Sequence, residues 1–322
     1  MCRSRTVPVA FIRFSPDLTD AAFAAEFHRV SAAATQGDGY APFNEQSLFD
    51  VAAGHRAPFL VVEKDGNVVV GAGILGAGEL DLVVDPARRR HGHGAAALAE
   101  ILAAAPGELT IWSHGDHPAA RALADRFAFT AERTLLQLRL DLTAESAGSA
   151  PAEPGVPDRT GIRAAIRIDA FRPGPDDAEW VALNALVFAA HPEQGSLTAS
   201  DLAARCAEPW FSAGDFLVAR DTGFGTGTGT GTGTGRMIGY NWLKVESGSP
   251  VGEIYVVGVH PDAAGRGVGR RLMLAGLDRL RERGCRTADL YVEADSAAAV
   301  ALYRSLGFTE RTIDVQYRRS PR

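Results

Sequence analysis

Residues 253–273 read EIYVVGVHPDAAGRGVGRRLM and pass from an apolar strand through a glycine turn into a basic helix. The backbone N–H groups of such a turn and the positive end of the helix dipole together favour a bound phosphate. The turn departs from the dinucleotide fingerprint G-x-G-x-x-G, because Arg270 stands where a third glycine is needed after Gly265 and Gly267. The P-loop is excluded as well, since no Lys-Ser or Lys-Thr pair follows. The stretch therefore predicts a phosphate ligand of another kind.

The helix after the turn is predicted over residues 268–283 and has one broad apolar side. Gly276 lies in the middle of this side and would let the helix approach a sheet closely. The opposite side is charged, as expected for an amphipathic helix packed on a sheet. The apolar side consists of Val268, Leu272, Met273, Leu277 and Leu280.

Composition restricts the class of protein. The 322 residues are enough for two ordinary domains, and a formal net charge of −6 argues against nucleic acid or an anionic membrane as the main partner. Cys2, Cys206 and Cys285 are odd in number and far apart, which disfavours a disulfide framework or a cysteine-based zinc site. The chain shows no apolar run of transmembrane length and no signal-peptide segment. We expect a reduced, cytoplasmic protein without a metal.

The chain contains an internal duplication. Residues 78–102 and then 109–130 repeat the pattern of residues 252–277 and then 288–309. Each half runs through a strand, a proline, a glycine turn, a helix, a second strand, an Ala-rich helix and a closing Phe-Thr. Such self-similarity predicts one domain present twice.

Two low-complexity segments lie between these patterns. Residues 144–161, rich in Ala, Ser, Pro and Gly, are predicted to form a linker between an N-terminal domain (1–143) and a C-terminal domain (162–322). Residues 222–235 read TGFGTGTGTGTGTG and are predicted to be an elongated hairpin loop, because they cannot bury a core.

Each half also has a pair of strand-like runs before its glycine turn. These are residues 59–63 with 67–72, and residues 216–220 with 237–245. The order of elements predicts the α/β class with an α+β-type mixed sheet in each domain. We expect this sheet to be mostly antiparallel, with one parallel pair joined by a crossover helix.

Three motifs of the C-terminal half resemble the GNAT superfamily of acyl-CoA N-acyltransferases. They are Val259-His260-Pro261, Gly265-Arg266-Gly267-Val268-Gly269 and Leu302-Tyr303-x-x-x-Gly307-Phe308. The resemblance implies two tandem GNAT domains and acetyl-CoA as co-substrate, with no metal. The phosphate ligand would then be the pyrophosphate of coenzyme A, bound by turn N–H groups that only glycines leave accessible.

The resemblance also implies which residues bind acetyl-CoA. In the C-terminal half they are Val257, Gly258, Val259, Ala264, Gly265, Arg266, Gly267, Val268, Gly269, Arg270 and Ser296. In the N-terminal half they are Leu82, Val83, Val84, Arg89, Arg90, His91, Gly92, His93 and Gly94. The N–H groups of Val257, Gly258 and Val259 would polarise the thioester carbonyl, and Gly258 suits a β-bulge that splays the strand and exposes them.

Two positions depart from the superfamily pattern. Ala264 stands where Gln or Arg opens the motif, so weaker pyrophosphate binding is expected. Ser296 stands where an Asn often begins the last Ala-rich helix; its hydroxyl could cap that helix and reach a polar group of coenzyme A.

Amine acetylation needs a base for the ammonium proton and an acid for the departing thiolate. The resemblance implies Glu253 as base, directly or through water, and Tyr303 as acid. Glu253 could instead be an exposed strand-end charge, and Tyr303 a core aromatic beside Phe308. In the N-terminal half Glu79 aligns with Glu253, but Ala124 aligns with Tyr303. We expect that half to bind acetyl-CoA without turning it over.

Further motifs resemble the mycothiol-forming branch of the superfamily, whose members acetylate the cysteinyl amine of a cysteinyl-glucosaminyl-inositol pseudodisaccharide. They are NEQ (44–46), HPEQG (191–195) and W-x-K (242–244). This likeness implies a small-molecule substrate, no nucleic acid or membrane partner, and a monomer. His191 and His260 receive no role. The implied substrate-binding residues are Glu45, Glu193, Lys244, Glu253 and Tyr291.

Two other functions remain open at this point. The chain could acetylate another amine, such as an aminoglycoside or a protein N-terminus. It could also be a non-catalytic acyl-CoA sensor. Glu253 and Tyr303 argue against the sensor, and HPEQG together with the duplication argues against a generic transferase.

Overall fold

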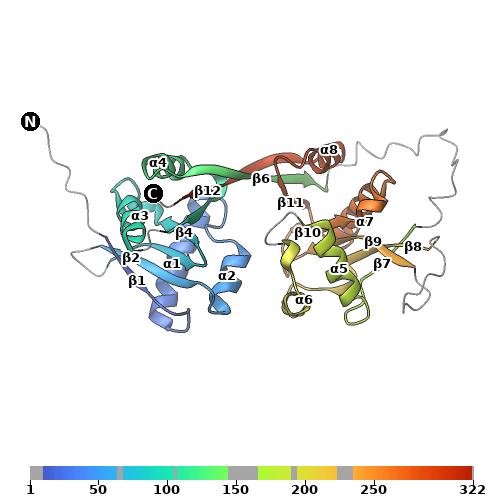
Figure 1. Cartoon of the computed structure of the whole chain (residues 1–322), viewed down its shortest axis with the longest axis horizontal. Helices are drawn as coiled ribbons and strands as arrows, with labels where there is room; N and C mark the ends of the chain where they lie inside the picture. The colour runs from blue at the N-terminus through green and yellow to red at the C-terminus, as the bar shows by residue number, and fades with distance from the viewer. Residues whose placement is uncertain are drawn as a thin grey trace, which may run out of the picture. The chain divides into compact units, whose positions relative to one another are not determined.

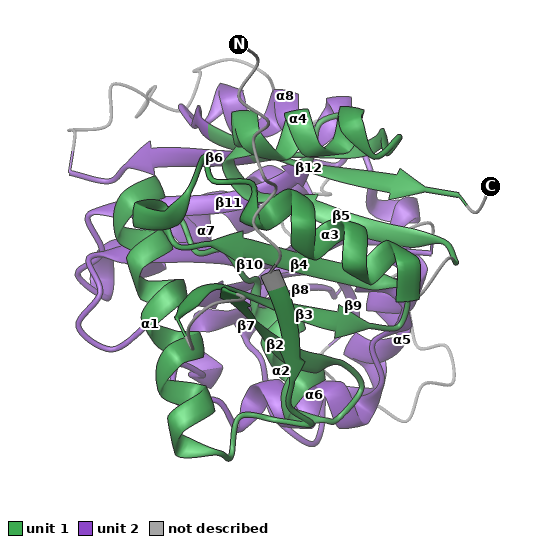
Figure 2. Cartoon of the chain, turned by 90° about the vertical axis from the view of Figure 1, so that its left-hand side faces the viewer, with its two compact units in different colours: residues 1–136, 293–295, 312–322 green, residues 137–292, 296–311 purple. Residues whose placement is uncertain are grey.

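The computed structural model describes residues 10–63, 68–104, 107–143, 166–189, 194–222 and 235–320. The chain divides into two compact units, coloured separately in Figure 2. The first comprises residues 1–136, 293–295 and 312–322, and the second comprises residues 137–292 and 296–311. The predicted linker lies outside the described residues, and so does most of the predicted hairpin loop, so the domain boundaries remain predictions.

The first unit is built on a mixed sheet (Figure 1). Neighbouring strands from β1 to β4 pair antiparallel, and β4 pairs parallel with β5 across the crossover helix α3. The strands are β1 (Ala10–Phe14), β2 (Ala57–Glu63), β3 (Val69–Gly76), β4 (Glu79–Val84), β5 (Leu109–Ser113) and β6 (Thr130–Asp141), whose last residues belong to the second unit. The helices are α1 (Ala21–Asp38), α2 (Glu45–Ala52), α3 (His93–Ala104) and α4 (Pro118–Arg126).

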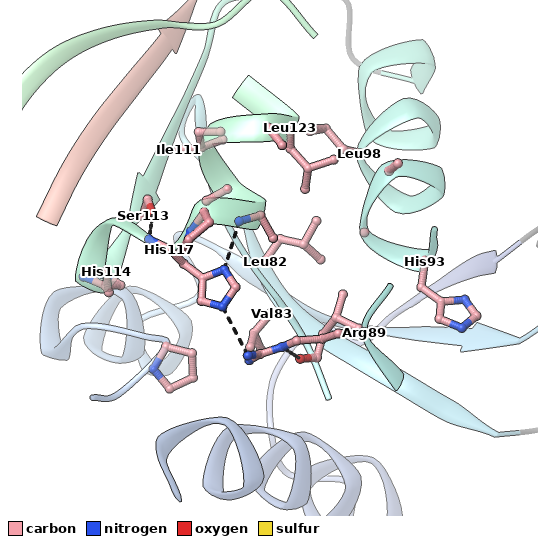
Figure 3. Close-up of a pocket in the computed structure, with 18 of the residues that line it drawn as sticks. Leu82, Val83, Arg89, His93, Leu98, Ile111, Ser113, His114, His117 and Leu123 are labelled. Atoms are coloured by element: carbon pink, nitrogen blue, oxygen red, sulfur yellow. Dashed lines mark hydrogen bonds between the residues drawn. The ribbon is translucent and has the colours of Figure 1, made fainter. Parts of the chain in front are cut away.

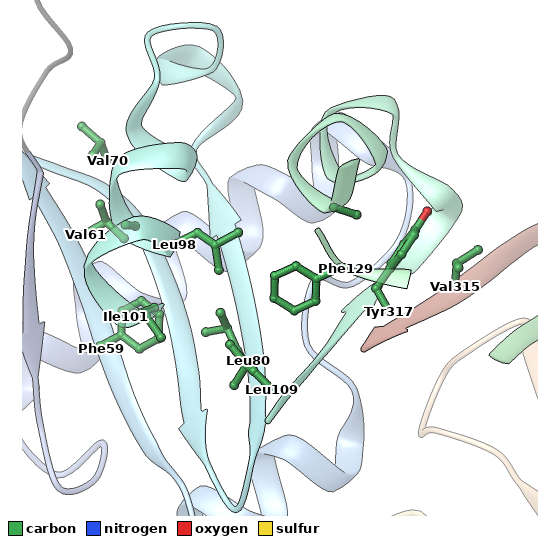
Figure 4. Close-up of a cluster of buried hydrophobic side chains, with 12 residues drawn as sticks. Phe59, Val61, Val70, Leu80, Leu98, Ile101, Leu109, Phe129, Val315 and Tyr317 are labelled. Carbon is green, nitrogen blue, oxygen red and sulfur yellow. The ribbon is translucent and has the colours of Figure 1, made fainter. Parts of the chain in front are cut away.

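Helices cover both faces of this sheet. On one face α1 buries Phe27 and Val30 against strand side chains that include Val83. On the other face α3 buries Leu98 and Ile101 against Leu80 and its neighbours (Figure 4). Leu80 and Val83 of β4, three residues apart, therefore point to opposite faces, as strand geometry requires.

A strand from the end of the chain completes the first unit. β12 (Thr309–Arg319) begins in the second unit, and its residues from Thr312 onward belong to the first (Figure 2). There Val315–Arg319 pair antiparallel with β5. Val315 and Tyr317 pack in the core around Phe129 (Figure 4). A polypeptide cut at the linker would therefore lose a strand of its N-terminal sheet.

The second unit repeats this plan, which confirms the predicted fold class. Neighbouring strands from β7 to β10 pair antiparallel, and β10 pairs parallel with β11 across the crossover helix α7. None of the helices that the structure describes is long and apolar enough to cross a membrane. The strands are β7 (Ile166–Ala170), β8 (Phe216–Asp221), β9 (Arg236–Lys244), β10 (Val251–Val259) and β11 (Thr287–Glu293). The helices are α5 (Asp177–Val187), α6 (Ala199–Cys206), α7 (Val268–Glu282) and α8 (Ala297–Ser305).

The predicted packing of α7 is confirmed. Every residue predicted for its apolar side is buried, and Gly276 is buried with them. A Cβ atom on Gly276 would lie 2.3 Å from Nδ2 of Asn241, whose amide donates to the Leu272 carbonyl at 3.0 Å. Glycine is required here because β9 and α7 approach too closely for a methyl group.

We expect Gly276→Ala to lower the free energy of unfolding by about 1–3 kcal/mol, the usual cost of overpacking a core. Urea titration followed by circular dichroism would measure the change. Gly107→Ala is the matched control, because a Cβ atom there meets nothing within 4 Å. Equal stability of the two variants would contradict the close approach of β9 and α7.

Candidate active site

In each unit the parallel strand pair separates before the strands end. β10 and β11 pair from Val251 with Thr287 to Ile254 with Leu290, although both strands continue beyond these residues. In the first unit the pairing of β4 with β5 likewise ends at Leu80 with Ile111. A gap between two strands that keep unpaired backbone groups is a place for an extended ligand.

Backbone N–H groups point into both gaps. The His260 amide donates to the Ile238 carbonyl on β9 at 2.8 Å. Because strand amides alternate in direction, the N–H groups of Val257 and Val259 point toward β11. In the first unit the Asp85 amide donates to Val70 at 2.9 Å, so those of Leu82 and Val84 point toward β5.

The β-bulge predicted at Gly258 lies instead at Tyr255, so its predicted position is wrong. The register with β9 shifts between Ile254 and Val256, so Tyr255 is the extra residue, while Gly258 pairs regularly with Tyr240. Gly258 is needed for another reason, since a Cβ atom there would lie 2.8 Å from the Tyr240 ring. The bulge also explains why the segment from Glu253 to Pro261 is one residue longer than the corresponding segment from Glu79 to Pro86. In the first unit, β4 shows no register shift against β3.

A short 3₁₀ turn follows each strand and leads into the glycines. His260 Nδ1 accepts from the Asp262 amide at 3.1 Å, and Asp85 Oδ1 accepts from the Ala87 amide at 3.0 Å. His260, which had no predicted role, therefore caps the turn.

The glycine turns have similar backbones. Gly265 and Gly267 have φ of 75° and 77°, and Arg90 and Gly92 have φ of 69° and 87°. These left-handed residues bring the chain to the first turns of α7 and α3. Both units thus have a left-handed turn before a helix N-terminus, an arrangement that suits an anion.

The gap in the first unit opens into a cavity of about 810 Å³ (Figure 3). All the residues predicted to bind acetyl-CoA in this half line it, except His91. The lining ones are Leu82, Val83, Val84, Arg89, Arg90, Gly92, His93 and Gly94. Apolar side chains such as Leu98 and Leu123 form one side of the cavity (Figure 3).

Cationic side chains surround the turn at the mouth of this cavity. Arg88 and Arg90 line it and are exposed. The Arg89 guanidinium instead donates to both Asp38 oxygens at 2.6 Å and its Nε to the Val84 carbonyl at 3.1 Å. Arg89 therefore holds the end of α1 against β4, and Arg88 and Arg90 offer charge to an anion.

In the second unit the predicted base lies in a row of charged side chains. The strand register places Glu253 opposite Lys244 on β9 and opposite Asp289 on β11. A Cβ atom on Gly252 would meet Leu280 of α7 at 2.4 Å, so Glu253 points to the face away from α7. Tyr291, two residues after Asp289, lies on the same face and is 46% exposed. The structure thus brings three predicted substrate residues, Glu253, Lys244 and Tyr291, to one face.

Aromatic and ionic contacts hold this row. Lys244 Nζ lies 5.2 Å from the Trp210 ring centroid and 6.0 Å from that of Tyr255. These rings favour the cation. Asp289 accepts from the Arg139 guanidinium at 2.5 and 2.6 Å. Sequence reasoning missed Trp210, Asp289 and Arg139, because only strand pairing and folding bring them to this row.

The predicted acid is buried in α8. Tyr303 is 6% exposed, its ring centroid lies 6.1 Å from that of Phe308, and burial raises its pKa to about 12. It is therefore protonated at neutral pH. Ser296 occupies the N-cap position of α8, but its side chain makes no capping hydrogen bond, so the predicted hydroxyl cap is wrong.

The remaining substrate predictions concern two motifs. Glu45 is the first residue of α2 in the first unit, after the N-cap residue Asn44. Glu193 lies outside the described residues. The carbonyl of Gln194, the next residue of the HPEQG motif, accepts from Asn184 Nδ2 at 2.6 Å, and Asn184 Oδ1 accepts from the Tyr240 hydroxyl at 2.7 Å. Asn184 therefore anchors Gln194 to the sheet.

The first unit has no counterpart of the proposed acid Tyr303, and its counterpart of Glu253 is engaged in an ion pair. The Phe129 amide donates to Ala124 at 2.9 Å as the Phe308 amide donates to Tyr303 at 3.1 Å, which supports the predicted alignment. Ala124 is fully buried and has no acidic group. The carboxylate of Glu79 lies 3.2 Å from the buried guanidinium of Arg56. Glu79 is therefore held in an ion pair with Arg56.

The chain belongs to the acetyltransferase (GNAT) family, whose model matches residues 24–129 and 187–308. It is 45% identical over 289 residues to the mycothiol acetyltransferase of Clavibacter sepedonicus, with 88% of each chain covered. It is 43% identical over 317 residues to the mycothiol acetyltransferase of Sanguibacter keddieii, with 93% of this chain and 94% of the relative covered.

Solved structures show the same tandem fold. A tandem GNAT protein from the clavulanic acid biosynthesis pathway matches with a TM-score of 0.68 at 19% identity, covering 97% of this chain and 99% of that one. A GCN5-related N-acetyltransferase from Sphaerobacter thermophilus matches with a TM-score of 0.64 at 22% identity, covering 100% and 98%.

Proposed function

We propose that the second unit transfers the acetyl group of acetyl-CoA to the cysteinyl amine of cysteinyl-glucosaminyl-inositol, the last step of mycothiol biosynthesis. The observation that carries this proposal is Glu253 on β10, directly before the point where the strands part. The names of the relatives support the choice of substrate. The charged row beside Glu253 suits a cationic amine with many hydroxyl groups.

The groups of the second unit account for each step of the transfer. The glycine turn and the N-terminus of α7 hold the pyrophosphate, while the thioester lies in the gap between β10 and β11. Glu253 takes a proton from the ammonium group, and the free amine attacks the carbonyl carbon. The N–H groups of Val257 and Val259 stabilise the oxyanion. When the C–S bond breaks, the Tyr303 hydroxyl gives its proton to the thiolate, the nitrogen loses its second proton as the amide forms, and a proton from solvent restores the hydroxyl.

We propose that the first unit binds acetyl-CoA but does not transfer its acetyl group. Its cavity has the turn, the gap and the strand amides, which suit the ligand. Ala124 leaves no acid for the thiolate, and Arg56 engages Glu79. The strand β12 is needed to complete this unit, so the test requires the full-length chain.

The experiment is acetyl transfer followed by mass spectrometry, with acetyl-CoA and the cysteinyl pseudodisaccharide beside simple amines. We expect an acetylated cysteinyl product from the wild type, and none above background from a full-length Glu253→Gln, Tyr303→Phe double variant. A wild type that acetylates only other amines would overturn the substrate. A double variant with substantial turnover would overturn either the roles of Glu253 and Tyr303 or the proposal that the first unit does not transfer the acetyl group.

A further inference from the structure

The cavity of the first unit is lined in part by His114, whose buried imidazole the proposed function does not use. His114 follows β5, and its Nδ1 lies 2.8 Å from Oδ2 of Asp314. The other carboxylate oxygen accepts from the Gly115 amide at 2.8 Å. The His114 and Asp314 side chains are only 13% and 10% exposed. Asp314 lies on β12, so the strand that completes the sheet also fixes this ring.

The second nitrogen of this ring has no partner within the described part of the chain. Nε2 of His114 is buried and makes no hydrogen bond there, although His114 lines the cavity. A buried polar atom left without a partner costs free energy. A ligand that reached this ring through the cavity would supply the missing hydrogen bond.

The surroundings of His114 favour its charged form. Burial lowers the pKa of His114, but the hydrogen bond and charge of Asp314, together with the charge of Asp81, outweigh it and raise the pKa above its ordinary value. Asp81 is itself paired with Arg56 at 2.8 Å. The Trp112 ring stacks on His114 with centroids 6.3 Å apart. A protonated ring carries a hydrogen on both nitrogens, so Nε2 is a donor.

Other charged groups near this end are engaged elsewhere. Asp116, two residues further on, accepts from the Arg121 guanidinium. Tyr40 packs against Gly115, where a Cβ atom would lie 2.1 Å from its ring, and the pKa of Tyr40 is raised by burial. Tyr40 is therefore neutral at physiological pH and does not compensate the imidazolium.

The cavity extends from the glycine turn to His114. Its lining includes Leu98 of α3 on one face of the sheet and Tyr40, which follows α1, on the other. It therefore passes between β4 and β5. His93, the first residue of α3, and His114 lie on opposite sides of the cavity (Figure 3). A ligand with its pyrophosphate at the turn would place its acyl end near His114.

We propose that His114 Nε2 donates a hydrogen bond to the thioester carbonyl of acyl-CoA in the first unit, so that this cavity selects acylated over free coenzyme A. This inference rests on the proposed binding of acetyl-CoA to this unit. A thioester carbonyl is a good acceptor, whereas a neutral thiol is a weak one. His114 is here a ligand-binding residue and takes no part in transfer.

Nuclear magnetic resonance of the full-length chain with ¹⁵N-labelled histidine tests this directly. His114 and His93 are assigned from the signals lost in His114→Gln and His93→Gln. The ligands are acetyl-CoA, a ketone analogue with methylene in place of sulfur, and S-ethyl-CoA, which lacks the carbonyl. We expect all three to shift His93. Acetyl-CoA and the ketone should also raise the pKa of His114 by about one unit. A ligand that binds the protonated ring tenfold more tightly than the neutral ring raises the pKa of that ring by this amount.

The two signals separate the possible failures. If His93 shifts but the pKa of His114 is unchanged, or changes equally with S-ethyl-CoA, the proposed hydrogen bond is refuted while acetyl-CoA binding stands. If neither signal responds, acetyl-CoA binding to the first unit fails and this inference with it.

Affinities read from the His93 signal give a second test. The wild type should bind acetyl-CoA about tenfold or more tighter than S-ethyl-CoA, as a hydrogen bond from a charged donor implies. His114→Ala should abolish this preference. His114→Gln keeps an N–H donor and should retain part of the preference without its pH dependence. His28→Gln, an exposed histidine of α1, is the matched control. An undiminished preference in His114→Ala would overturn the assignment.

Discussion

Glu253→Gln is expected to lower kcat for acetyl transfer by about 10²–10³-fold near neutral pH, because the proposed general base is lost while its shape is kept. The deficit should shrink as the pH rises past the amine pKa, roughly 7.7–8.0 for an α-amino group, since the amine then loses its proton without help. Steady-state rates measured by release of the coenzyme A thiol across this pH range would show both effects.

The matched control is Glu310→Gln, which removes an exposed carboxylate of the same unit from β12. It should leave kcat and its pH profile unchanged. A Glu253→Gln variant with a pH-independent deficit would refute the role of base and leave Glu253 a substrate-binding group. Such a variant would raise KM more than it lowered kcat.

Tyr303→Phe is expected to lower kcat by about 10²-fold, because no acid then protonates the departing thiolate. The fold should tolerate this change, since the ring still packs beside Phe308. Because burial raises the pKa of Tyr303 to about 12, the wild-type acid keeps its proton up to and beyond the ordinary tyrosine pKa of about 10. The ratio of wild-type to variant rates should therefore stay constant from neutral pH to about pH 10.

Tyr317→Phe is the matched control for this prediction. Tyr317 is also buried, but it packs in the core of the first unit. This variant should retain the wild-type rate. If Tyr303→Phe retained it too, Tyr303 would be a core aromatic and the thiolate would leave without a protein acid.

Local signals in the chain predicted the shared scaffold of both units. The periodicity of residues 268–283 predicted α7 to within one residue of its end at Glu282. The duplicated order of elements predicted both parallel strand pairs and their crossover helices. These features depend on neighbouring residues and on strand–helix connections of restricted handedness, so a single sequence carries them.

The site was predictable only where its groups lie on that scaffold. Glu253 and the glycine turn occupy one continuous stretch, and the cavity lining of the first unit followed from aligning the halves. The bulge was misplaced because Gly258 is required by the Tyr240 ring of the adjacent strand rather than by its own backbone. The cap expected of Ser296 also failed, since local preference does not decide where a hydroxyl points.

The sequence by itself determined the repeated domain and its two glycine turns, and it placed Glu253 and Tyr303, the proposed base and acid, in one half only. Only the tertiary structure decided that β12 completes the first unit, that Arg56 engages Glu79, and that Asp314 orients His114. These last contacts join residues 23 to 200 positions apart. Such pairs form when strands are set side by side, and no local propensity encodes which distant partner a charged side chain will meet.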